Sequence, residues 1–540
     1  MCLRQNPDKT RISSNNPNIL VDIFMFKKIL LQILVVLLFF ILTVFFTYPL
    51  FVGKTVNTAD ALLHIWIISW NNHQFFSNPL HLFHSNIFAP HQYTLAFTEN
   101  EIAISLIAGP VLKLFNDPVL AYNFLIVFGF VVCGYGMYLL ISYLTKDKLI
   151  AVLAGIIYAF APFKIVHGFD RLHTTGLWLP FVFLTFVFVN YKIHNLDKRV
   201  IYKLLVFFLL ILIFVLPIAY PYFKVKELYN FSRPEGEVLY YSPVLLDYFL
   251  PSWANKYYQF PLPDEYVVTP GIIVWLLLFF SLFVFAKDKI KINLTEKELL
   301  IYAILSLVGL TLSLGLFLNL SQRSTSDIVG PFYLLYYLIP GFNGIRAPGR
   351  FSIFFLISVI AIISLGLKRF FKQQARIKKN LLLIIVMFLL LIEFSFAGQE
   401  DKFVDNFEFK QIPLIYSWLK EQPGDFIVLE LPLGWNKEIG SYDPGYVYYS
   451  IYHWKKIVNG YSGYVPPGYY QLNQDLKAFE TPKIVKWLRK YDVKYIVLHL
   501  DKYKGSLEGQ EVLEKLNSNP DKFKLITRFG NDWVYMFKNN

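Results

Sequence analysis

The stretch FKKILLQILVVLLFFILTVFFTYPLFVGKTVNTADALLHIWIISWNNH, residues 26–73, joins a long apolar run to a segment with regularly spaced polar residues. An apolar run of about 20 residues is long enough to cross a bilayer as a helix. If the chain after it continues as a helix, Asp60, His64 and Asn71 project within roughly 40° of one another. The stretch therefore predicts a membrane span, followed by a surface helix with one narrow polar stripe.

The rest of the chain repeats the apolar pattern. Of its 540 residues 55% are hydrophobic and 16% are charged, whereas soluble proteins carry about 25% charged residues. We therefore expect a polytopic α-helical membrane protein. About nine spans are predicted, at residues 28–49, 119–144, 149–166, 172–191, 200–222, 267–286, 298–320, 351–367 and 380–398. The apolar run at 101–115 is short for a span and predicts an interfacial or re-entrant helix.

Clusters of lysine and arginine predict which ends of these spans face the cytoplasm. In a nine-span threading five clusters fall on one side, which the positive-inside rule makes the cytoplasm. They lie at residues 27–28, 146–148, 192–203, 287–297 and 368–379. The N-terminus is then cytoplasmic in a multi-pass protein of the cytoplasmic membrane. The clusters account for the net charge of +13, so we expect no nucleic-acid partner.

Three regions follow from this threading. Residues 1–25 form a mostly polar leader that we expect to be disordered, and Met25 is an alternative start of the chain. Residues 26–398 form the transmembrane domain, with a first outer loop at 51–118. Residues 399–540 form an extracytoplasmic domain, for which short apolar runs at 426–433, 494–500, 523–530 and 533–540 predict strands separated by helices.

The helix after Asp60 has two interpretations. Trp66 and Trp70 suit headgroup depth, and Asp60 would favour a helix N-terminus electrostatically, so it can be a capped interfacial helix and no more. Alternatively, Asp60 is the base or metal-binding carboxylate of a site at the bilayer surface, with His64 beside it.

The first outer loop contains further ionisable residues that are candidates for the same site as Asp60. Glu99 and Glu101 stand where the chain returns to the membrane, and can line a cleft that faces Asp60 or simply begin the next helix. Metal binding is a further alternative, because His81, His84, His91, Glu99 and Glu101 are residue types that bind divalent metals. The metal candidates are Asp60, His91 and Glu99, although the spacing matches no tight zinc signature.

Basic residues near the predicted outer ends of spans suggest phosphate binding. Arginine and lysine hold phosphates by charge-assisted contacts, and arginine is costly within the membrane. A local surface ion pair or snorkelling to lipid headgroups explains the same residues without a site. The candidates are Lys164, His167, Asp170 and Arg171 in one turn, and Arg346 and Arg350 in a later loop.

The arrangement resembles the C-type (GT-C) membrane glycosyltransferases, and more closely the bacterial YfhO-like membrane proteins grouped around them. The first span carries the resemblance together with ADALLHIWIISWNNH, NPLHLFHSNIFAPH, FTENE, AGIIYAFAPFKIVHGFDRLH, GFNGIRAPGRF and YHWKKIVNGYSGYVPPGYY. It covers most of the chain as architecture. Asp60 departs from the family pattern, because it stands in ADA without an adjacent acidic residue.

The resemblance implies an enzyme that takes a sugar from a polyprenyl-phosphate donor and passes it to a glycan or lipid acceptor at the outer face. Asp60 would be the first-loop carboxylate, with Glu99 or Glu101 as a second. Lys164, Arg171, Arg346 and Arg350 would be candidates for the phosphate. Two other functions stay open: a lipid or glycan translocase, which the nearly charge-free spans disfavour, and a non-catalytic scaffold for envelope assembly.

Overall fold

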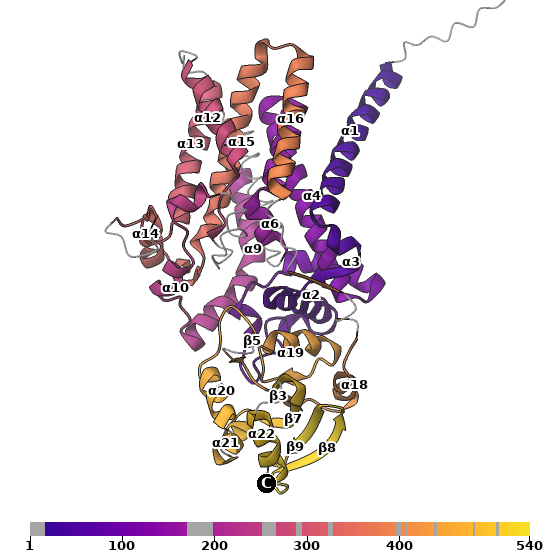
Figure 1. The fold of residues 1–540 in the computed structure, drawn as a ribbon. Coiled ribbons are helices and arrows are strands. Elements are labelled where there is room, and N and C mark those ends of the chain that lie inside the picture. Colours follow the sequence, from indigo (N-terminus) through magenta and orange to yellow (C-terminus); the bar gives the residue numbers. More distant parts are fainter. Residues whose placement is uncertain are drawn as a thin grey trace, which may run out of the picture.

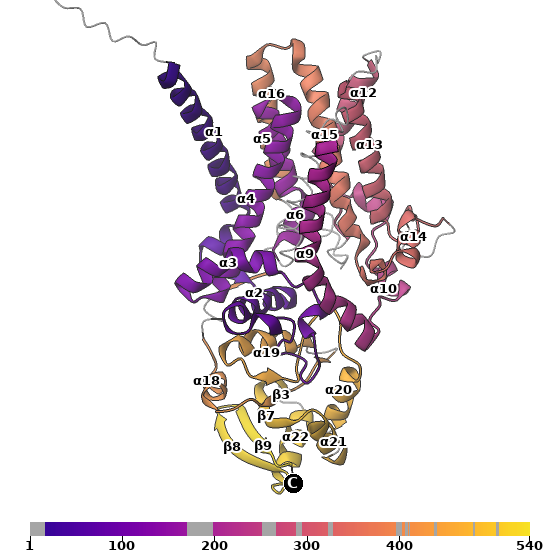
Figure 2. The ribbon, with the colours of Figure 1, turned by 180° about the vertical axis from the view of Figure 1, so that it is seen from behind.

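The computed structural model describes residues 17–169, 198–250, 266–287, 294–321, 328–395, 402–405, 409, 411–436, 440–478, 481–503 and 507–539. Figures 1 and 2 show a bundle of long helices joined end to end with a smaller α/β domain that holds the C-terminus. Between the two bodies lies α2 (Ala59–Ser77), which runs across the direction of the long helices.

The bundle is built mainly from apolar helices. Its elements and their close neighbours are α1 (Pro17–Phe46), α3 (Ile102–Phe115), α4 (Pro118–Thr145), α5 (Lys148–Phe160), α6 (Pro162–Gly168), α9 (Lys198–Tyr229), α10 (Glu235–Tyr240), α12 (Ile272–Lys287), α13 (Leu294–Ser313), α14 (Pro331–Leu338), α15 (Ser352–Phe370) and α16 (Arg376–Ser395). The first helix begins at Pro17, inside the segment predicted as a disordered leader, and residues 1–16 lie outside the described residues.

Three helical segments are long and apolar enough to cross a membrane: Met25–Phe46, Pro118–Thr145 and Pro348–Gln373. A fourth arises if α5 and α6, which are bent by 45° at their junction, form one span. These helices indicate a membrane protein, but the nine predicted spans are not shown. The apolar helices α3 and α12 are shorter, and the predicted span at 172–191 lies outside the described residues.

One predicted span forms a shorter helix than expected. The span expected at 298–320 ends as a helix at Ser313, because the backbone then turns and Phe317 forms a β-bridge with Val329. This turn brings the chain back toward α14 instead of continuing the helix. The short helix predicted at 101–115 is present as α3, with 14 residues.

The helices α1, α4 and α5 approach closely around one buried ring. Phe39 is fully buried, and a Cβ atom added at Gly134 would lie 2.6 Å from its ring. A Cβ atom at Gly155 would lie 2.3 Å from the ring and 2.6 Å from the carbonyl oxygen of Gly134. Glycine at both positions therefore allows the three helices to pack at this distance.

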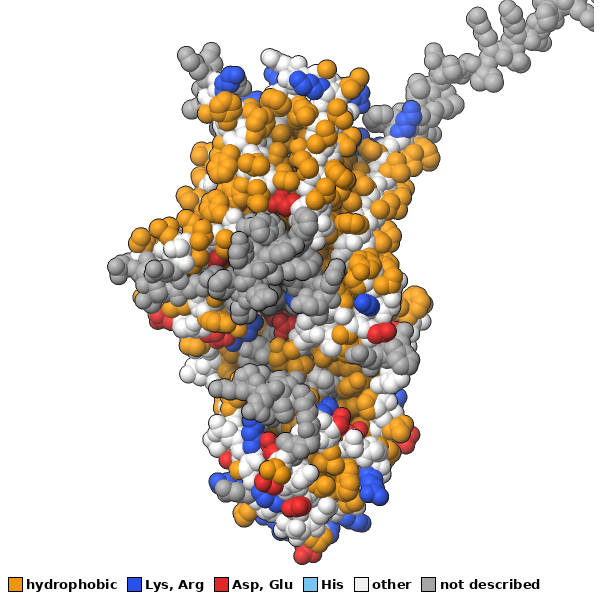
Figure 3. Space-filling model, in the orientation of Figure 1, with side chains coloured by type: hydrophobic (Ala, Val, Ile, Leu, Met, Phe, Trp, Pro, Cys, Tyr) orange, Lys and Arg blue, Asp and Glu red, His pale blue; other side chains and the backbone are white. Residues whose placement is uncertain are grey.

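Basic residues gather at the end of the bundle that lies far from the α/β domain. Figure 3 shows hydrophobic side chains over the visible helical surface and Lys and Arg at its far end. There Lys379 forms an ion pair with Asp147, and Lys368 donates to the carbonyl of Leu144 at 3.1 Å. Two of the five basic clusters in the sequence, 146–148 and 368–379, thus lie side by side.

The C-terminal domain has a five-stranded sheet in the order β6–β3–β7–β9–β8. The three strands β6, β3 and β7 are parallel, whereas β9 runs antiparallel to both of its neighbours, β7 and β8. Its elements are α18 (Leu414–Glu421), β3 (Ile427–Leu431), β4 (Trp435–Asn436), β5 (Gly440–Ser441), α19 (Asp443–Tyr449), β6 (Lys456–Ile457), α20 (Tyr469–Ala478), α21 (Thr481–Lys490), β7 (Val493–His499), α22 (Leu507–Asn517), β8 (Phe523–Phe529) and β9 (Asp532–Phe537). The four predicted strand segments correspond to β3, β7, β8 and β9.

Backbone hydrogen bonds join the first loop to the C-terminal domain at several places. Strand β1 (Lys54–Val56) pairs antiparallel with β2 (Phe403–Asp405). Further on, Asn86 accepts a hydrogen bond from Ile457 at 2.8 Å, and Phe88 donates to Asn459 at 3.0 Å. The loop therefore continues the sheet beyond its edge strand β6.

Gly155→Ala tests the close approach of the helices. The added methyl group has no space beside Phe39, so we expect a loss of about 1–3 kcal/mol of stability and a lower thermal unfolding midpoint in detergent. Gly236→Ala is the matched control, because no heavy atom lies within 4 Å of the added Cβ atom. Equal midpoints for the two variants would contradict this packing.

Candidate functional site

Helix α2 begins where its sequence supplies a cap. The Thr58 hydroxyl accepts the N–H of Ala61 at 3.1 Å, so it satisfies one of the free amides at the helix N-terminus. From Ala61 to Asn72 every residue is buried. α2 is therefore an internal helix, packed against α3, α4 and α19, and its apolar sides are covered by protein and not exposed as on a surface helix.

The two tryptophans of α2 are also buried, whereas we expected them to lie among lipid headgroups. The indole N–H of Trp66 donates to the side chain of Asn86 at 3.1 Å, and that of Trp70 donates to the carbonyl of Leu82 at 2.8 Å. Both rings are at most 4% exposed. They hold the following loop onto the helix and are covered by protein.

The polar stripe of α2 is present, and each of its members has its own partner. Asp60 accepts a hydrogen bond from the Tyr461 hydroxyl at 2.8 Å. His64 Nδ1 lies 2.6 Å from Glu101 Oε1. Asn71 donates to the Asn100 carbonyl at 2.7 Å and to the Ser105 hydroxyl at 2.9 Å. The stripe thus faces residues 100–105 at the start of α3, and its first residue meets the C-terminal domain.

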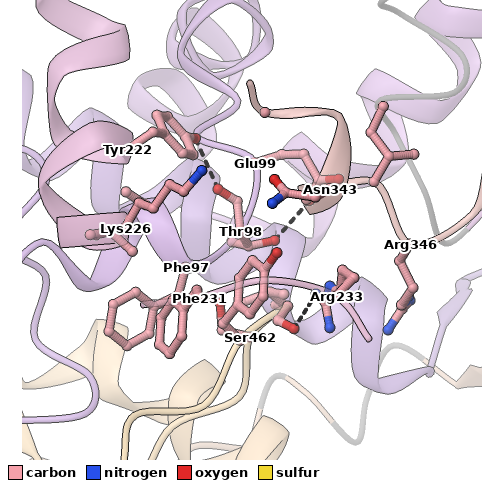
Figure 4. Close-up of a pocket in the computed structure, with 18 of the residues that line it drawn as sticks. Phe97, Thr98, Glu99, Tyr222, Lys226, Phe231, Arg233, Asn343, Arg346 and Ser462 are labelled. Atoms are coloured by element: carbon pink, nitrogen blue, oxygen red, sulfur yellow. Dashed lines mark hydrogen bonds between the residues drawn. The ribbon is translucent and has the colours of Figure 1, made fainter. Parts of the chain in front are cut away.

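A cavity of about 460 Å³ opens beside the first half of this stripe. Figure 4 shows that its walls come from segments far apart in the sequence. They are α2, the segment 96–99, the end of α9, the loop 341–350 and the segment 461–464 of the C-terminal domain. Asp60, His64, Glu99, Arg346 and Arg350 all line this cavity.

Cationic side chains outnumber carboxylates in the lining. Arg350 lies 3.5 Å from Glu99 and is partly exposed, and the Arg346 guanidinium lies 4.6 Å from the centre of the Tyr241 ring. Lys226 of α9 extends toward Thr98 in Figure 4. An anion that enters this cavity meets arginine, which can hold a phosphate through two hydrogen bonds.

Arg233 connects the cavity wall to the C-terminal domain. Its guanidinium pairs with Glu237 at 2.9 Å, donates to the Gly463 carbonyl and lies 4.0 Å from the centre of the Tyr464 ring. That ring stacks on Phe231 with centroids 4.6 Å apart. These contacts fix the segment 461–464, which carries the tyrosine that binds Asp60.

The pair of His64 and Glu101 is buried behind the cavity surface. Both side chains are at most 4% exposed. Burial alone would lower the pKa of His64, but the Glu101 carboxylate outweighs it, and Asp60 and Glu99 act in the same direction. The pKa of His64 therefore rises to about 9. Glu101 thus favours the protonated form of His64, which adds a positive charge beside the cavity.

Glu101 reaches His64 through an unusual backbone conformation. Its φ is 50°, in the left-handed region that residues other than glycine seldom adopt. It directly precedes α3, and its carboxylate points back at α2 and away from the cavity lining. Of the two candidate second carboxylates, Glu99 faces the cavity and Glu101 holds His64.

The other candidates lie elsewhere. Lys164 and His167 are buried in α6, where Lys164 lies 3.6 Å from the Cys133 sulfur and His167 bonds the Phe163 carbonyl, so neither lines the cavity. The bend between α5 and α6 carries them inward. Asp170 and Arg171 lie outside the described residues.

The metal hypothesis receives no support from the described residues. His91 packs against Tyr229 and Tyr491 and does not line the cavity with Asp60 and Glu99. Within the described part of the chain, no three His, Cys, Asp or Glu side chains are grouped to hold a metal ion.

Sequence reasoning missed Lys226 and Arg233. Both follow the apolar part of α9, in KVKELYNFSR, where a basic residue at the end of a helix has an ordinary explanation as an anchor. Their clustering with Arg346 depends on tertiary contacts that no local pattern reports.

This arrangement can bind an anionic group with Arg346, Arg350 and Lys226, and it presents the Asp60 carboxylate to the same space. Its chemistry has to be argued from the residues themselves. A comparison of the chain with models of known protein families found no match, and neither did a comparison with curated protein sequences.

Proposed function

We propose that the cavity is the active site of a membrane glycosyltransferase. The enzyme would move a sugar from a polyprenyl-phosphate donor to a glycan or lipid acceptor, at the outer face of the cytoplasmic membrane. The observation that carries the proposal is that Asp60 and the two arginines Arg346 and Arg350 line one cavity, although nearly 300 residues separate them in the chain.

The surroundings suit a donor with a lipid tail. Elements that form or adjoin the cavity wall also expose large apolar side chains, among them Phe223 of α9 at 66% and Leu338 of α14 at 70%. A prenyl chain can lie against such a surface while its phosphate enters the cavity.

The cations would act on the leaving group. When the bond between the sugar C1 and the phosphate oxygen breaks, negative charge develops on that oxygen. Arg346 and Arg350, held at the cavity wall, stabilise this charge without reorganising during the reaction. No nucleotide is required, because the donor bond supplies the free energy.

Asp60 would act as the base. Its carboxylate takes the proton of an acceptor hydroxyl, whose oxygen then forms the new bond to C1. The hydrogen bond from Tyr461 fixes the carboxylate, and His64, held by Glu101, places a positive charge near it. The proton leaves to solvent after transfer. Asp60 touches the acceptor, whereas His64, Glu101 and Tyr461 are positioning residues.

Asp60→Asn tests the base. The amide keeps the shape of the side chain and cannot take a proton, so we expect sugar transfer in membranes to fall about 10²–10⁴-fold. The measurement is incorporation of labelled sugar from a panel of polyprenyl-phosphate donors. Asp425→Asn, at an exposed carboxylate of the C-terminal domain, serves as the control. Unchanged transfer by Asp60→Asn would exclude this mechanism.

Arg350→Gln tests stabilisation of the leaving phosphate. Loss of one such donor is expected to lower kcat about 10²-fold. Arg528→Gln, on β8 of the C-terminal domain, is the control and should leave the rate unchanged. An effect on KM alone would mean that Arg350 binds the donor without acting on the leaving group.

If lipid moves across vesicles and no acceptor is modified, the protein is a translocase instead.

The pair of His64 and Glu101 predicts a dependence of stability on pH. The pKa of His64 is raised from 6.5 to about 9 in the folded protein, so the stabilisation is fully present below pH 6.5. It is lost as the pH rises through 9. The thermal midpoint of the wild type should therefore exceed that of His64→Gln/Glu101→Gln most at pH 6, and the difference should shrink by pH 10. A constant difference would show that the pair is not ionised.

A further inference from the structure

A second cavity, of about 470 Å³, lies at the other half of α2. His73 lines it, nine residues after His64 of the first cavity, and nine residues at 100° each turn a helix to its opposite face. The second cavity is bounded by α2, α3 and the C-terminal domain. The residues that give it its chemistry are His73, Phe76, Lys113, Lys420, Tyr452 and Trp454.

The lining of this cavity is positively charged. Lys113 comes from α3 and Lys420 from α18, and none of the described residues that line the cavity is Asp or Glu. Two acidic residues adjoin the lining in sequence: Glu421 follows Lys420, and Asp117, between Asn116 and Pro118, accepts the N–H of Leu120 where it caps α4. The charge of the two lysines therefore favours an anion.

An indole ring forms one wall. Trp454 has φ 56°, a left-handed conformation that a bulky residue adopts at a cost, so the surrounding structure holds it there. Its ring stacks on His73 with centroids 4.1 Å apart and an angle of 7° between the planes. Indole rings prefer the depth of lipid headgroups.

The rim of the cavity is apolar and exposed. Phe76 is 82% exposed, and Leu114 and Phe115 at the end of α3 are 78% and 62% exposed. Lys113 lies over the Phe76 ring, 5.9 Å from its centre. A short helix with exposed apolar side chains and a lysine at its end is the pattern of a segment that lies in the membrane interface.

We propose that the second cavity binds the phosphate headgroup of an anionic membrane phospholipid. Lys113 and Lys420 hold the phosphate, Trp454 and His73 pack against the glycerol region, and the acyl chains lie on Phe76, Leu114 and Phe115. One lipid then contacts both α3 and the C-terminal domain. This binding goes beyond the proposed glycosyl transfer and does not depend on it, because the two cavities occupy opposite faces of α2.

The experiment measures phospholipid retained by the purified full-length protein. The protein is incubated with phosphatidylglycerol or phosphatidylcholine, and bound lipid is counted by native mass spectrometry. We expect preference for phosphatidylglycerol, and about fivefold weaker binding for each of Lys113→Gln and Lys420→Gln. Trp454→Ala should weaken binding as well. Lys524→Gln, at an exposed position of β8, is the control and should bind as the wild type does.

Other outcomes would overturn the proposal. Equal retention of the two lipids, or wild-type retention by both lysine variants, would show that the cavity holds no anionic headgroup. Full competition by inorganic phosphate would assign it to a soluble anion, and competition by an uncharged glycan would assign it to sugar. Loss of phosphatidylglycerol binding in Arg350→Gln would place the lipid in the first cavity. If Asp60→Asn retains sugar transfer while lipid preference persists, only the glycosyltransferase proposal fails.

Discussion

The burial of α2 is the constraint on which the junction between the helical bundle and the C-terminal domain depends. Twelve consecutive residues, Ala61 to Asn72, are buried, and most are apolar. A helix that is apolar on nearly all sides has to be covered on all sides. The bundle covers one flank through α3 and α4, and the C-terminal domain covers another through α19. The few polar residues of α2 need partners in the same interior, because an unpaired buried polar group is costly.

Both cavities border on α2, because this helix lies between the bundle and the C-terminal domain. The helix is rigid and capped, so side chains on its opposite faces are held at fixed positions relative to each other. Asp60 emerges on the face where the loop 341–350 supplies arginine, and His73 on the face where α3 and α18 supply lysine. Sites built on rigid elements hold their geometry more precisely than sites on loops.

Local sequence patterns predicted the features that depend on periodicity. The stripe of Asp60, His64 and Asn71 follows from the 3.6-residue repeat, and the strands β3, β7, β8 and β9 from their apolar runs. Such patterns did not predict how deeply a side chain is buried within the protein. Trp66 matches the composition of an interfacial helix, but a loop that begins 12 residues later covers it. Lys164 is buried in the protein because Pro162 permits a bend between α5 and α6. The cavity cations Lys226 and Arg233 join Arg346 only through tertiary contacts, which a single sequence does not encode locally.

The pairing of β1 with β2 bears on how the protein is made. Residues 54–56 leave the ribosome long before residues 403–405, so the first loop waits for most of the chain before its strand finds a partner. During that interval the face of α2 that α19 will cover has no partner from the C-terminal domain. Completion of the C-terminal domain is thus the step that covers this apolar face of α2.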